Sequence, residues 1–534
     1  MLSPEFLAIG GGSASGYTAN VANSLRFRAS NSANATRTNA AAGNAQKATF
    51  SFWAKRGQLG TGQAVFGTYN VGSQYFYFGF ASNDQFVVLE VVTSTQYWLQ
   101  TSAVFRDPTA WYHIVVAIDT TQTTAANRVR IYANGVELTS FSTNSPPALN
   151  YSHTYLNANA RVNYIGGNGG LGWLDAHLAE FTYVDGQQLT PASFGQADGT
   201  GLWVHKPYTG TYGTLGSLHE FEDATSTTTI VKDTSGNGNG YSSSGISVTS
   251  GVTFDQSLDT PTLDFPNLVA INSQSTVTIS EANTAASYGG VANTGTALVS
   301  IPFPTTGKWY YEHLCVATGA SDYFVGILLN RSVAGVAGNI IVPGTNSNEY
   351  AYRANGNKMI GGTTSAYGAS YTANDVIGVA FDADNLTLEF VKNGVSQGQL
   401  TGLAAGQYVA FSLTYNGGST KLNFGARSFA YTPPTGFKAL HSQNIANTTL
   451  SLSGSFTGNA AADGPVIWAA GNHATLTING NSVTFGTHAD KIAGGFKLRS
   501  SSASYNAAGS NTWTATAGLR FVRSKRANNA QVNP

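Results

Sequence analysis

The chain of 534 residues has little charge and almost no cysteine. Charged residues make up 10% of the sequence, against roughly 25% in an average globular protein. The 27 basic residues balance the 27 acidic ones, so no electrostatic footprint for nucleic acid or an anionic membrane is expected. The single Cys315 excludes a disulfide framework within the chain, and its strand-like surroundings predict a buried small hydrophobe.

Long apolar runs and a secretory signal are also missing. No apolar run approaches the ~18 residues of a transmembrane helix, which predicts no membrane insertion. The first residues contain a short apolar stretch, but Glu5 stands where a signal peptide has basic residues. Residues 1–16 combine this apolar tip with a Gly-Ser-rich stretch and are interpreted as an anchoring tether or a disordered terminus.

Enzymatic motifs are absent too. No nucleophile elbow, P-loop or dinucleotide fingerprint stands between a strand and a helix. Glycan hydrolysis needs two paired carboxylates, and nothing in the sequence pairs the strand-borne Glu90, Glu180, Glu312 and Glu389. The run from Lys232 to Gly240 resembles a calcium loop but lacks the closing Glu, and Asx-turns explain its spacing. We therefore predict no enzyme, no metal and no cofactor.

The residues that are abundant favour β-structure. Aromatic residues make up 12% of the chain and glycines number 61. Short runs rich in aromatic and β-branched residues are separated by turn residues, as strands require, and no window keeps a helical period. Four of these runs are Ala48 to Trp53, Tyr75 to Phe80, Gln85 to Val92 and Trp111 to Ile118.

One pattern occurs twice. A strand is followed by a turn, a second strand, the dipeptide Asn-Gly and a third strand, first from Trp111 to Leu138 and again from Asp375 onward. Asn134-Gly135 and Asn393-Gly394 predict type I′ turns, because both central residues of that turn need positive φ. Two three-stranded meanders in different sequence contexts predict two related sandwiches.

The predicted fold class is all-β, with two tandem jelly-roll sandwiches and a small C-terminal β domain. We expect sandwiches at residues 17–199 and 267–441, joined by a Gly-, Ser- and Thr-rich connector at 200–266 with a few packed strands. Residues 442–534 should form the C-terminal domain, with a hairpin from Ala474 to Phe485. Its basic tail carries Arg520, Arg523, Lys525 and Arg526 and is expected to be solvated, or else to dock on an acidic neighbour.

Two families are recognisable in these segments. Thr49 to Gly57, the strand beginning at Trp111, and Asn127 to Leu138 resemble the laminin-G and concanavalin A-like family, a resemblance that covers about residues 17–195. Lys308 to Val316, Tyr323 to Leu329, and the closing Leu422 to Leu440 resemble a SPRY domain. The first resemblance implies a jelly roll with these segments as paired core strands. The SPRY resemblance implies a non-catalytic binding sandwich and a structural role for Glu312.

The tandem order, with the ending from Ala462 to Ser502, resembles virion and tail-fibre-like proteins of tailed phages. The resemblance implies a location on the virion surface and contacts with other virion proteins through the tether. The loops of the sandwiches are expected to bind host-surface polysaccharide or other virion proteins, and a homo-oligomer is expected, trimeric by analogy. A polysaccharide-degrading enzyme on a jelly-roll scaffold and a purely architectural cement protein remain alternatives.

Aromatic residues in loops are the candidates for contact with a glycan or partner, because aromatic rings stack on sugars. Long loops in compact sandwiches are usually functional, so the loop from Asn330 to Gly368 is predicted as the recognition surface. The candidate residues, all expected in loops, are Tyr69, Tyr97, Trp98, Tyr350, Tyr352 and Tyr367.

Overall fold

The computed structural model describes most of the chain up to residue 446 and the strands of the C-terminal region. The described ranges before that region are 20–70, 74–167, 172–198, 201–251, 253–269, 277–289, 294–319, 323–329, 349–415 and 417–446. The chain divides into two compact units, one made of Ala19–Gln196 and His205–His441 and the other of Met1–Thr18, Ala197–Val204 and Ser442–Pro534. The described residues are nearly all strand and turn, which confirms the all-β prediction.

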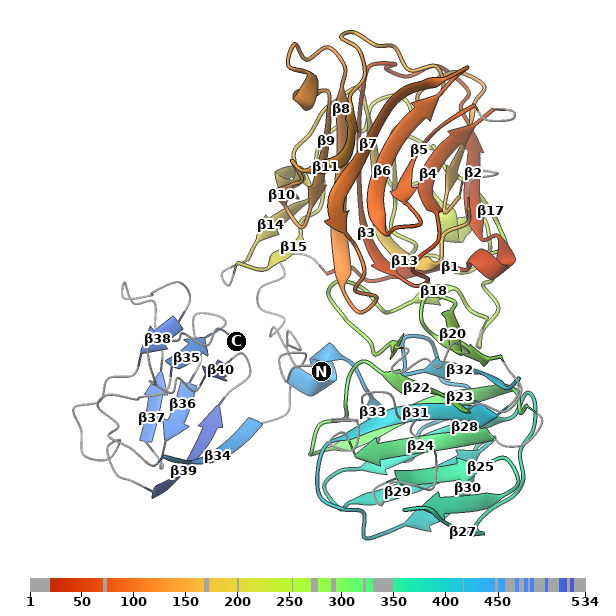
Figure 1. The fold of residues 1–534 in the computed structure, drawn as a ribbon, viewed down its shortest axis with the longest axis vertical. Helices are drawn as coiled ribbons and strands as arrows, with labels where there is room; N and C mark the ends of the chain where they lie inside the picture. The colour runs from red at the N-terminus through yellow and green to blue at the C-terminus, as the bar shows by residue number, and fades with distance from the viewer. Residues whose placement is uncertain are drawn as a thin grey trace. The chain divides into compact units, whose positions relative to one another are not determined.

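The first sandwich is built from two antiparallel sheets, which we name sheet A and sheet B (Figure 1). Sheet A has the order β10 (Val136–Glu137), β9 (Val129–Ala133), β8 (Trp111–Asp119), β3 (Lys47–Arg56), β13 (Ala176–Asp185), β1 (Ser24–Phe27) and β18 (Gln256–Ser257), with β16 (Ser217–His219) paired to β13. Sheet B has the order β11 (Phe141–Ser145), β7 (Thr95–Val104), β6 (Gln85–Val91), β5 (Tyr75–Phe80), β4 (Gln63–Tyr69), β12 (Val162–Ile165), β2 (Asn34–Thr38) and β17 (Ser242–Ser244).

Aromatic rings fill the space between sheets A and B. Phe50 of β3 packs on Phe66 of β4 with ring centroids 4.7 Å apart, and it stacks on Tyr183 of β13 at 4.5 Å. Phe78 of β5 closes the same cluster. Each such ring buries an apolar surface that contributes roughly 1.5–3 kcal/mol. The period-two alternation along these strands therefore turns the aromatic side chains into the space between the two sheets, where the core lies.

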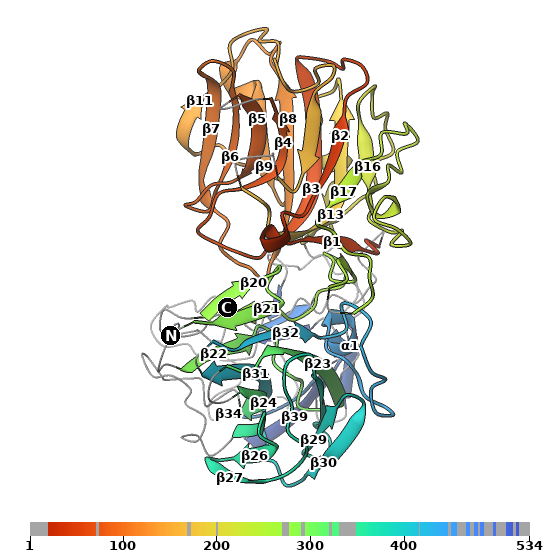
Figure 2. The same ribbon diagram turned by 90° about the vertical axis from the view of Figure 1, so that its right-hand side faces the viewer.

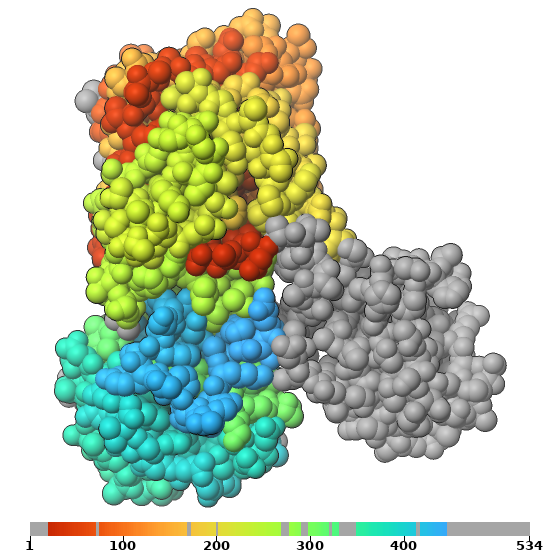
Figure 3. All heavy atoms as spheres, turned by 180° about the vertical axis from the view of Figure 1, so that it is seen from behind, coloured from red at the N-terminus to blue at the C-terminus, as the bar shows by residue number. Residues whose placement is uncertain are grey.

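Most of the predicted connector at 200–266 packs with the first sandwich, from His205 onward. Its strand β16 pairs with β13, β17 pairs with β2, and β18 pairs with β1. The pairings at β17 and β18 extend both sheets by one edge strand, as Figure 2 shows for β17. Figure 3 shows the yellow-green segment spread over one face of this sandwich. The packed strands expected in the connector are β16, β17 and β18, and the boundary expected at residue 199 does not end the first sandwich.

The second sandwich also has two sheets, named sheet C and sheet D. Sheet C has the order β19 (Leu268–Val269), β22 (Thr294–Val299), β31 (Tyr408–Tyr415), β24 (Tyr323–Leu329), β25 (Glu349–Arg353), β26 (Asn357–Ile360) and β27 (Thr363–Ala366). Sheet D has the order β20 (Val277–Ser280), β21 (Ala285–Tyr288), β32 (Ser419–Asn423), β23 (Lys308–Ala317), β28 (Val376–Asp382), β29 (Thr387–Lys392) and β30 (Val395–Leu400), with β33 (Lys438–Ala439) parallel to β23.

The predicted meanders are present in both sandwiches. β8, β9 and β10 form one edge of sheet A, and β28, β29 and β30 form one edge of sheet D. Asn134 and Gly135 have φ of 48° and 81°, and Asn393 and Gly394 have 47° and 81°. These values confirm the type I′ turns. Each meander lies next to a ten-residue strand, β3 or β23, so the two sandwiches share this arrangement.

The remaining elements are short. Four 3₁₀ helices are described, η2 (Ala29–Asn31), η3 (Ala125–Asn127), η4 (Pro191–Ser193) and η5 (Thr229–Val231), while β14 (Gly195–Ala197) and β15 (Trp203–His205) pair with each other. The C-terminal unit has helix α1 (Ser442–Ala446) and two small sheets. The first sheet has the order β34 (Leu450–Phe456), β39 (Gly509–Ala515), β36 (Thr475–Ile478) and β37 (Asn481–Thr484). The second has the order β38 (Gly495–Lys497), β35 (Val466–Ala469) and β40 (Leu519–Val522). The pairing of β36 with β37 confirms the predicted hairpin. Among the described residues, no helix has the length and hydropathy of a membrane span.

Buried polar contacts join the two sandwiches within one compact unit. Arg26 of β1 bonds to Asp255 at 3.0 Å and to Glu281 at 3.4 Å, and Lys421 of β32 reaches the same Glu281 at 2.7 Å. The buried carboxylate of Asp175 accepts the backbone N–H groups of Glu281 and Ala282. Breaking a buried ion pair typically costs about 3–5 kcal/mol. These contacts hold the two sandwiches together within that compact unit.

Candidate functional site

Three of the six candidate aromatic residues are buried on strands. Tyr97 of β7 is fully buried, and Tyr350 and Tyr352 of β25 are 6% and 0% exposed. Burial raises the pKa of the Tyr97 hydroxyl well above its ordinary value. The expectation that these three lie in loops is wrong, because strand alternation turns their rings into the sandwich cores. They cannot contact a partner at the surface.

The other three candidates reach the surface at least in part. Trp98 of β7 is 39% exposed, while Tyr69, at the end of β4, is half-buried. Tyr367 follows β27, and its ring packs edge-on against Tyr352 while its hydroxyl donates to the Gly398 carbonyl. Tyr367 is thus tied to the second sandwich, whereas Trp98 and Tyr69 share one face of sheet B.

That face of sheet B carries two cross-strand rows. In the first row, Trp98 lies opposite Leu89, Leu89 opposite Tyr77, Tyr77 opposite Gly67, and Gly67 opposite Tyr164. In the second row, Tyr69 lies opposite Tyr75 and Val162. The neighbouring Tyr97 and Phe76 point into the core, so these rows point away from it. We name Trp98, Tyr77, Tyr164, Tyr75 and Tyr69 the aromatic face.

The aromatic face is continuous and half-exposed. Tyr75 and Tyr77 lie with ring centroids 5.6 Å apart, and both are partly exposed together with Tyr164. Burial raises the pKa of Tyr77 to about 12, and the neighbouring Tyr75 adds to the shift. Gly67 carries no side chain between Tyr77 and Tyr164, and a glycine within a strand often marks a bulge or the close approach of a ligand or another backbone. Neutral rings with hydroxyl edges suit a sugar or a protein surface.

The loop predicted from Asn330 to Gly368 is largely not a loop where it is described. Residues 330–348 lie outside the described residues. The remainder forms β25, β26 and β27, paired antiparallel as one meander at the edge of sheet C. The loop prediction is wrong for these residues because a composition rich in Gly, Asn and Tyr is typical of loops and hides the strand pattern of β25.

The Asp233 loop is built from turns, which agrees with the Asx-turn interpretation. The Asp233 carboxylate accepts the backbone N–H groups of Leu218, Ser235 and Asn239. These hydrogen bonds outweigh the effect of burial and lower the pKa of Asp233. The Asn237 and Asn239 amides donate to the carbonyl of Gly216. Among the described residues, no cluster of three or more metal-ligating side chains is found.

The strand-borne glutamates occupy separate environments. Glu90 is fully buried and accepts the backbone N–H groups of Thr154 and Tyr155. Glu312 likewise accepts the N–H groups of Ala430 and Tyr431, although burial leaves its pKa raised. Both hold distant segments together, which is the structural role expected of Glu312.

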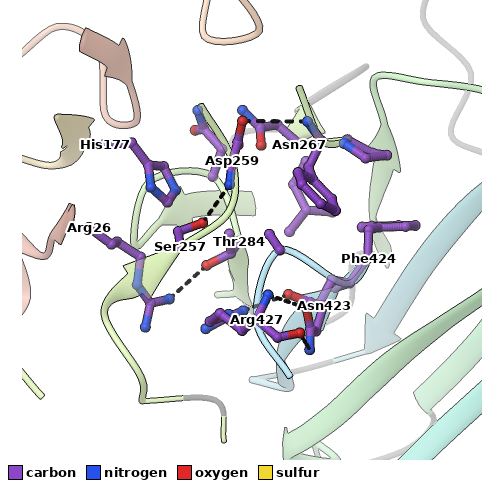
Figure 4. A pocket seen from close by; sticks show the side chains of 15 residues that line it. Arg26, His177, Ser257, Asp259, Asn267, Thr284, Asn423, Phe424 and Arg427 are labelled. Carbon is purple, nitrogen blue, oxygen red and sulfur yellow. Dashed lines mark hydrogen bonds between the residues drawn. The ribbon is translucent and has the colours of Figure 1, made fainter. Parts of the chain in front are cut away.

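A small cavity lies where the two sandwiches meet (Figure 4). Its volume is about 20 Å³, which is room for about one water molecule. Arg26 and Thr284 hydrogen-bond within it at 3.0 Å, and Asn423 donates to the Arg427 carbonyl. The hydrogen bond between Arg26 and Thr284 crosses the junction, so this cavity belongs to the structural contact.

Two family models match the chain. Residues 28–193 match the concanavalin A-like lectin/glucanases superfamily, and residues 308–427 match the SPRY domain. The chain carries a concanavalin A-like domain followed by a SPRY domain. The aromatic face therefore belongs to the concanavalin A-like domain, and the edge meander β25–β27 belongs to the SPRY domain.

Curated relatives match over short stretches. Ran-binding protein 10 of Danio rerio is 31% identical over 133 residues, which are 24% of this chain and 22% of that protein. Ran-binding protein 9 of Mus musculus is 29% identical over 160 residues, or 29% of this chain and 24% of that protein. The chain thus spans about a quarter of the length of these relatives.

Solved structures match over similar shares. The SPRY domain of human HERC1 has 22% identity and a TM-score of 0.23, covering 26% of this chain and 87% of that one. A human SPRY domain has 20% identity and a TM-score of 0.24, covering 30% of this chain and 99% of that one.

Proposed function

We propose that this protein is a non-enzymatic component of the bacteriophage virion surface. It serves as a tail fibre, head fibre or decoration and binds host-surface glycans or neighbouring virion proteins. The observation that carries the recognition part is the aromatic face of sheet B. The virion part is supported by the resemblance of the domain order and of the segment from Ala462 to Ser502 to phage proteins.

The aromatic face suits recognition without catalysis. Trp98 and the row of tyrosines present flat rings from paired strands, so their spacing is set by the sheet and costs little ordering entropy on binding. Tyrosine and tryptophan supply most of the energy in many binding surfaces. Stacking on a sugar ring or packing on a protein surface uses the same geometry.

The joined sandwiches suit an appendage. Arg26 forms ion pairs with Asp255 and Glu281, and the Arg26 side chain is only 1% exposed. Two sandwiches joined in one compact unit present the binding face as part of a larger folded body. The curated relatives are animal proteins matched over a quarter of their length, and they bear on the domain types only.

The test of the virion assignment is its presence on particles. Phage particles purified from a host whose genome or prophage encodes this chain are expected to contain it by mass spectrometry. Absence from intact particles would overturn the virion part. Loss of particle integrity without loss of adsorption, after deletion, would favour the architectural alternative.

The test of the recognition part uses the aromatic face. The double variant Trp98→Ala/Tyr77→Ala is expected to reduce adsorption of the purified protein to host cells at least tenfold. The matched control is Trp203→Ala, which removes a tryptophan away from sheet B. Unchanged adsorption of the double variant would remove the aromatic face from the proposal. Release of reducing ends from host polysaccharide would overturn the non-enzymatic claim.

A further inference from the structure

One lysine of the first sandwich is buried beside two carboxylates. Lys55 lies on β3 in the middle of sheet A, and its side chain is 0% exposed. Its Nζ lies 3.0 Å from Asp259 Oδ2, 3.2 Å from Asp259 Oδ1 and 2.6 Å from Asp264 Oδ1. Lysine is almost never fully buried unless it is paired, so these three side chains form one unit. We name Lys55, Asp259 and Asp264 the lysine triad.

A short turn brings the two carboxylates together. Asp259 and Asp264 stand directly before and after residues 260–263, whose two ends are joined by an antiparallel bridge. The backbone of Asp259 is fixed as well, because its N–H donates to Ser257 Oγ and its carbonyl accepts a hydrogen bond from Ser24 Oγ. The fold thus holds both carboxylates against a lysine that lies 204 positions before Asp259 in the sequence.

Asp259 has the features of an activated acyl group. Its side chain is buried, and burial raises the pKa of its carboxyl to about 6. Its Oδ1 accepts the Trp111 indole N–H at 3.2 Å and the Phe265 backbone N–H at 3.4 Å. Two donors aimed at one carbonyl oxygen form an oxyanion hole, which stabilises the negative charge that develops on that oxygen when a nucleophile adds to the carbon.

The Lys55 amine lies within reach of the Asp259 carboxyl carbon. Both carboxyl oxygens are bonded to Cγ, so the two N–O distances put Nζ roughly 3–3.5 Å from Cγ, which is a near-attack separation. Burial disfavours the Lys55 ammonium, but the carboxylates outweigh burial and raise its pKa. A proton must therefore move from Nζ to Asp259 before the amine can react. The raised pKa of Asp259 eases that transfer, and it removes two buried charges.

Asp264 is positioned to carry the second proton. Its Oδ1 is the carboxylate oxygen nearest to Nζ, and its side chain is 38% exposed whereas that of Asp259 is buried. A carboxylate that is hydrogen-bonded to a nucleophile can take its proton as general base and return it to the leaving group as general acid. The buried carboxyl is then the one that reacts, and the partly exposed one moves the proton.

We propose that Lys55 and Asp259 condense to form an amide bond within the chain. The neutral Nζ adds to Cγ of the protonated Asp259, and the negative charge on Oδ1 is held by the two donors. Asp264 takes one proton from Nζ and passes it to Oδ2, the Cγ–Oδ2 bond breaks, and Oδ2 leaves as water. One ammonium and one carboxylate are thus converted into one amide and one water, and neither an oxidant nor a reductant is needed.

The surroundings suit such a cross-link. Asp259 also lines the small cavity at the junction of the sandwiches, which has room for the water that leaves (Figure 4). The bond joins β3 to the chain that follows β18 and leads to the second sandwich. It closes a long loop, which stabilises the fold by constraining the unfolded chain. The lysine triad is independent of the aromatic face of sheet B, so either assignment can fail without the other.

The mass of the full chain tests the bond directly. Mass spectrometry of the intact purified protein is expected to give a mass lower than that of the sequence by one water molecule. Trypsin should not cleave after a cross-linked Lys55, so the peptide Ala48 to Arg56 is expected to be joined to the peptide Asp233 to Lys308. Fragmentation of this joined peptide is expected to place the bond at Asp259.

Three variants and one control assign the roles. Lys55→Met removes the nucleophile and is expected to abolish the cross-link. Asp264→Asn removes the proton carrier, and Trp111→Phe keeps a ring but removes the N–H. Each is expected to slow formation about 100-fold, measured by intact mass at intervals after cell-free synthesis. The matched control is Lys47→Met, which removes the ion pair of Lys47 with Asp119 on the same strand and is expected to keep the cross-link.

Each contrary outcome removes a defined part of the proposal. A parent mass equal to that of the sequence, with the peptide Ala48 to Lys55 released by trypsin, overturns the bond and leaves the lysine triad as a buried ion pair. A bond at Asp264 overturns the assignment of Asp259 as the acyl group. Formation at the parent rate in Asp264→Asn overturns its role as proton carrier. The mass of the parent protein decides the main point even where a variant does not fold.

Discussion

The carboxylate of Asp175, in the first sandwich, accepts a 2.7 Å hydrogen bond from the backbone N–H of Ala282, at the start of the second. The N–H of Glu281 donates to the same carboxylate at 3.1 Å. Glu281, Ala282 and Asn283 all have positive φ, from 53° to 62°. The buried carboxylate of Asp175 thus accepts two backbone N–H groups from a short left-handed turn that belongs to the other sandwich.

Removing this carboxylate should weaken the junction. Asp175→Ala leaves two buried N–H groups without an acceptor and is expected to lower the free energy of unfolding by about 3 kcal/mol. Asp175→Asn keeps one acceptor oxygen and should lose less. Urea unfolding followed by circular dichroism measures both, and parent-like unfolding of both variants would contradict the role given to Asp175.

A substitution at Gly57 should also weaken the junction between the sandwiches, for a steric reason. A Cβ at Gly57 would lie 2.0 Å from Asp175 Oδ1 and 2.8 Å from Ala282 Cα. Gly57→Ala is therefore expected to separate the sandwiches and to split the calorimetric unfolding into two transitions. The control is Gly240→Ala, where the nearest atom is 3.7 Å from the added Cβ. A single transition in both variants would show that the Cβ added at Gly57 does not uncouple the sandwiches.

Stability should fall in mild acid because at least four histidines, His177 among them, are buried in the neutral form. Burial lowers the pKa of His113 and His313 to about 3 and that of His219 to about 4. A lowered folded-state pKa gives stability that is present above the unfolded value near 6.5 and is lost as pH falls toward the folded value. Each histidine contributes at most about 1.4 kcal/mol per pH unit in that window.

Urea midpoints at pH 7.5, 6.0 and 5.0 measure this acid effect. His313→Asn removes one titrating group and is expected to reduce the slope by about 1.4 kcal/mol per pH unit, although the variant is less stable at pH 7.5. A slope identical to that of the parent would show that His313 is not held neutral.

The Cys315 thiol should be unreactive in the folded protein. It is fully buried in β23, and burial raises its pKa to about 12, with Asp375 adding to the shift. The thiolate is the reactive form, so labelling by a thiol reagent at pH 7.5 is expected to be at least ~1,000-fold slower than in urea. Rapid labelling without urea would contradict its burial.

Neighbouring aromatic residues on β7 should respond differently to truncation. Tyr97→Ala removes a core ring and is expected to cost about 3–5 kcal/mol, whereas Trp98→Ala removes a partly exposed ring and should cost about 1 kcal/mol or less. Thermal unfolding of the two variants measures the difference. Equal losses would place Trp98 in the core and remove it from the aromatic face.

The candidate site could be predicted only in part. The alternation in Tyr75 to Phe80 already separates two outward tyrosines from three inward phenylalanines, and this signal was available in the sequence. A prediction that places aromatic contact residues in loops leaves out Tyr75 and Tyr77, because both lie on a strand. Trp98 was found and Tyr97 beside it was misplaced, since only register decides which of two adjacent residues faces the core.

The sequence by itself determined the all-β class, the twin meanders and the positions of both Asn-Gly turns, because local conformational preference and period-two patterning suffice for these. Tertiary structure alone decided that β16, β17 and β18 complete the first sandwich and that Arg26 meets Glu281. It also decided that Lys55 meets Asp259 and Asp264. These contacts join residues far apart in sequence, and their partners are chosen by packing, which no local pattern records.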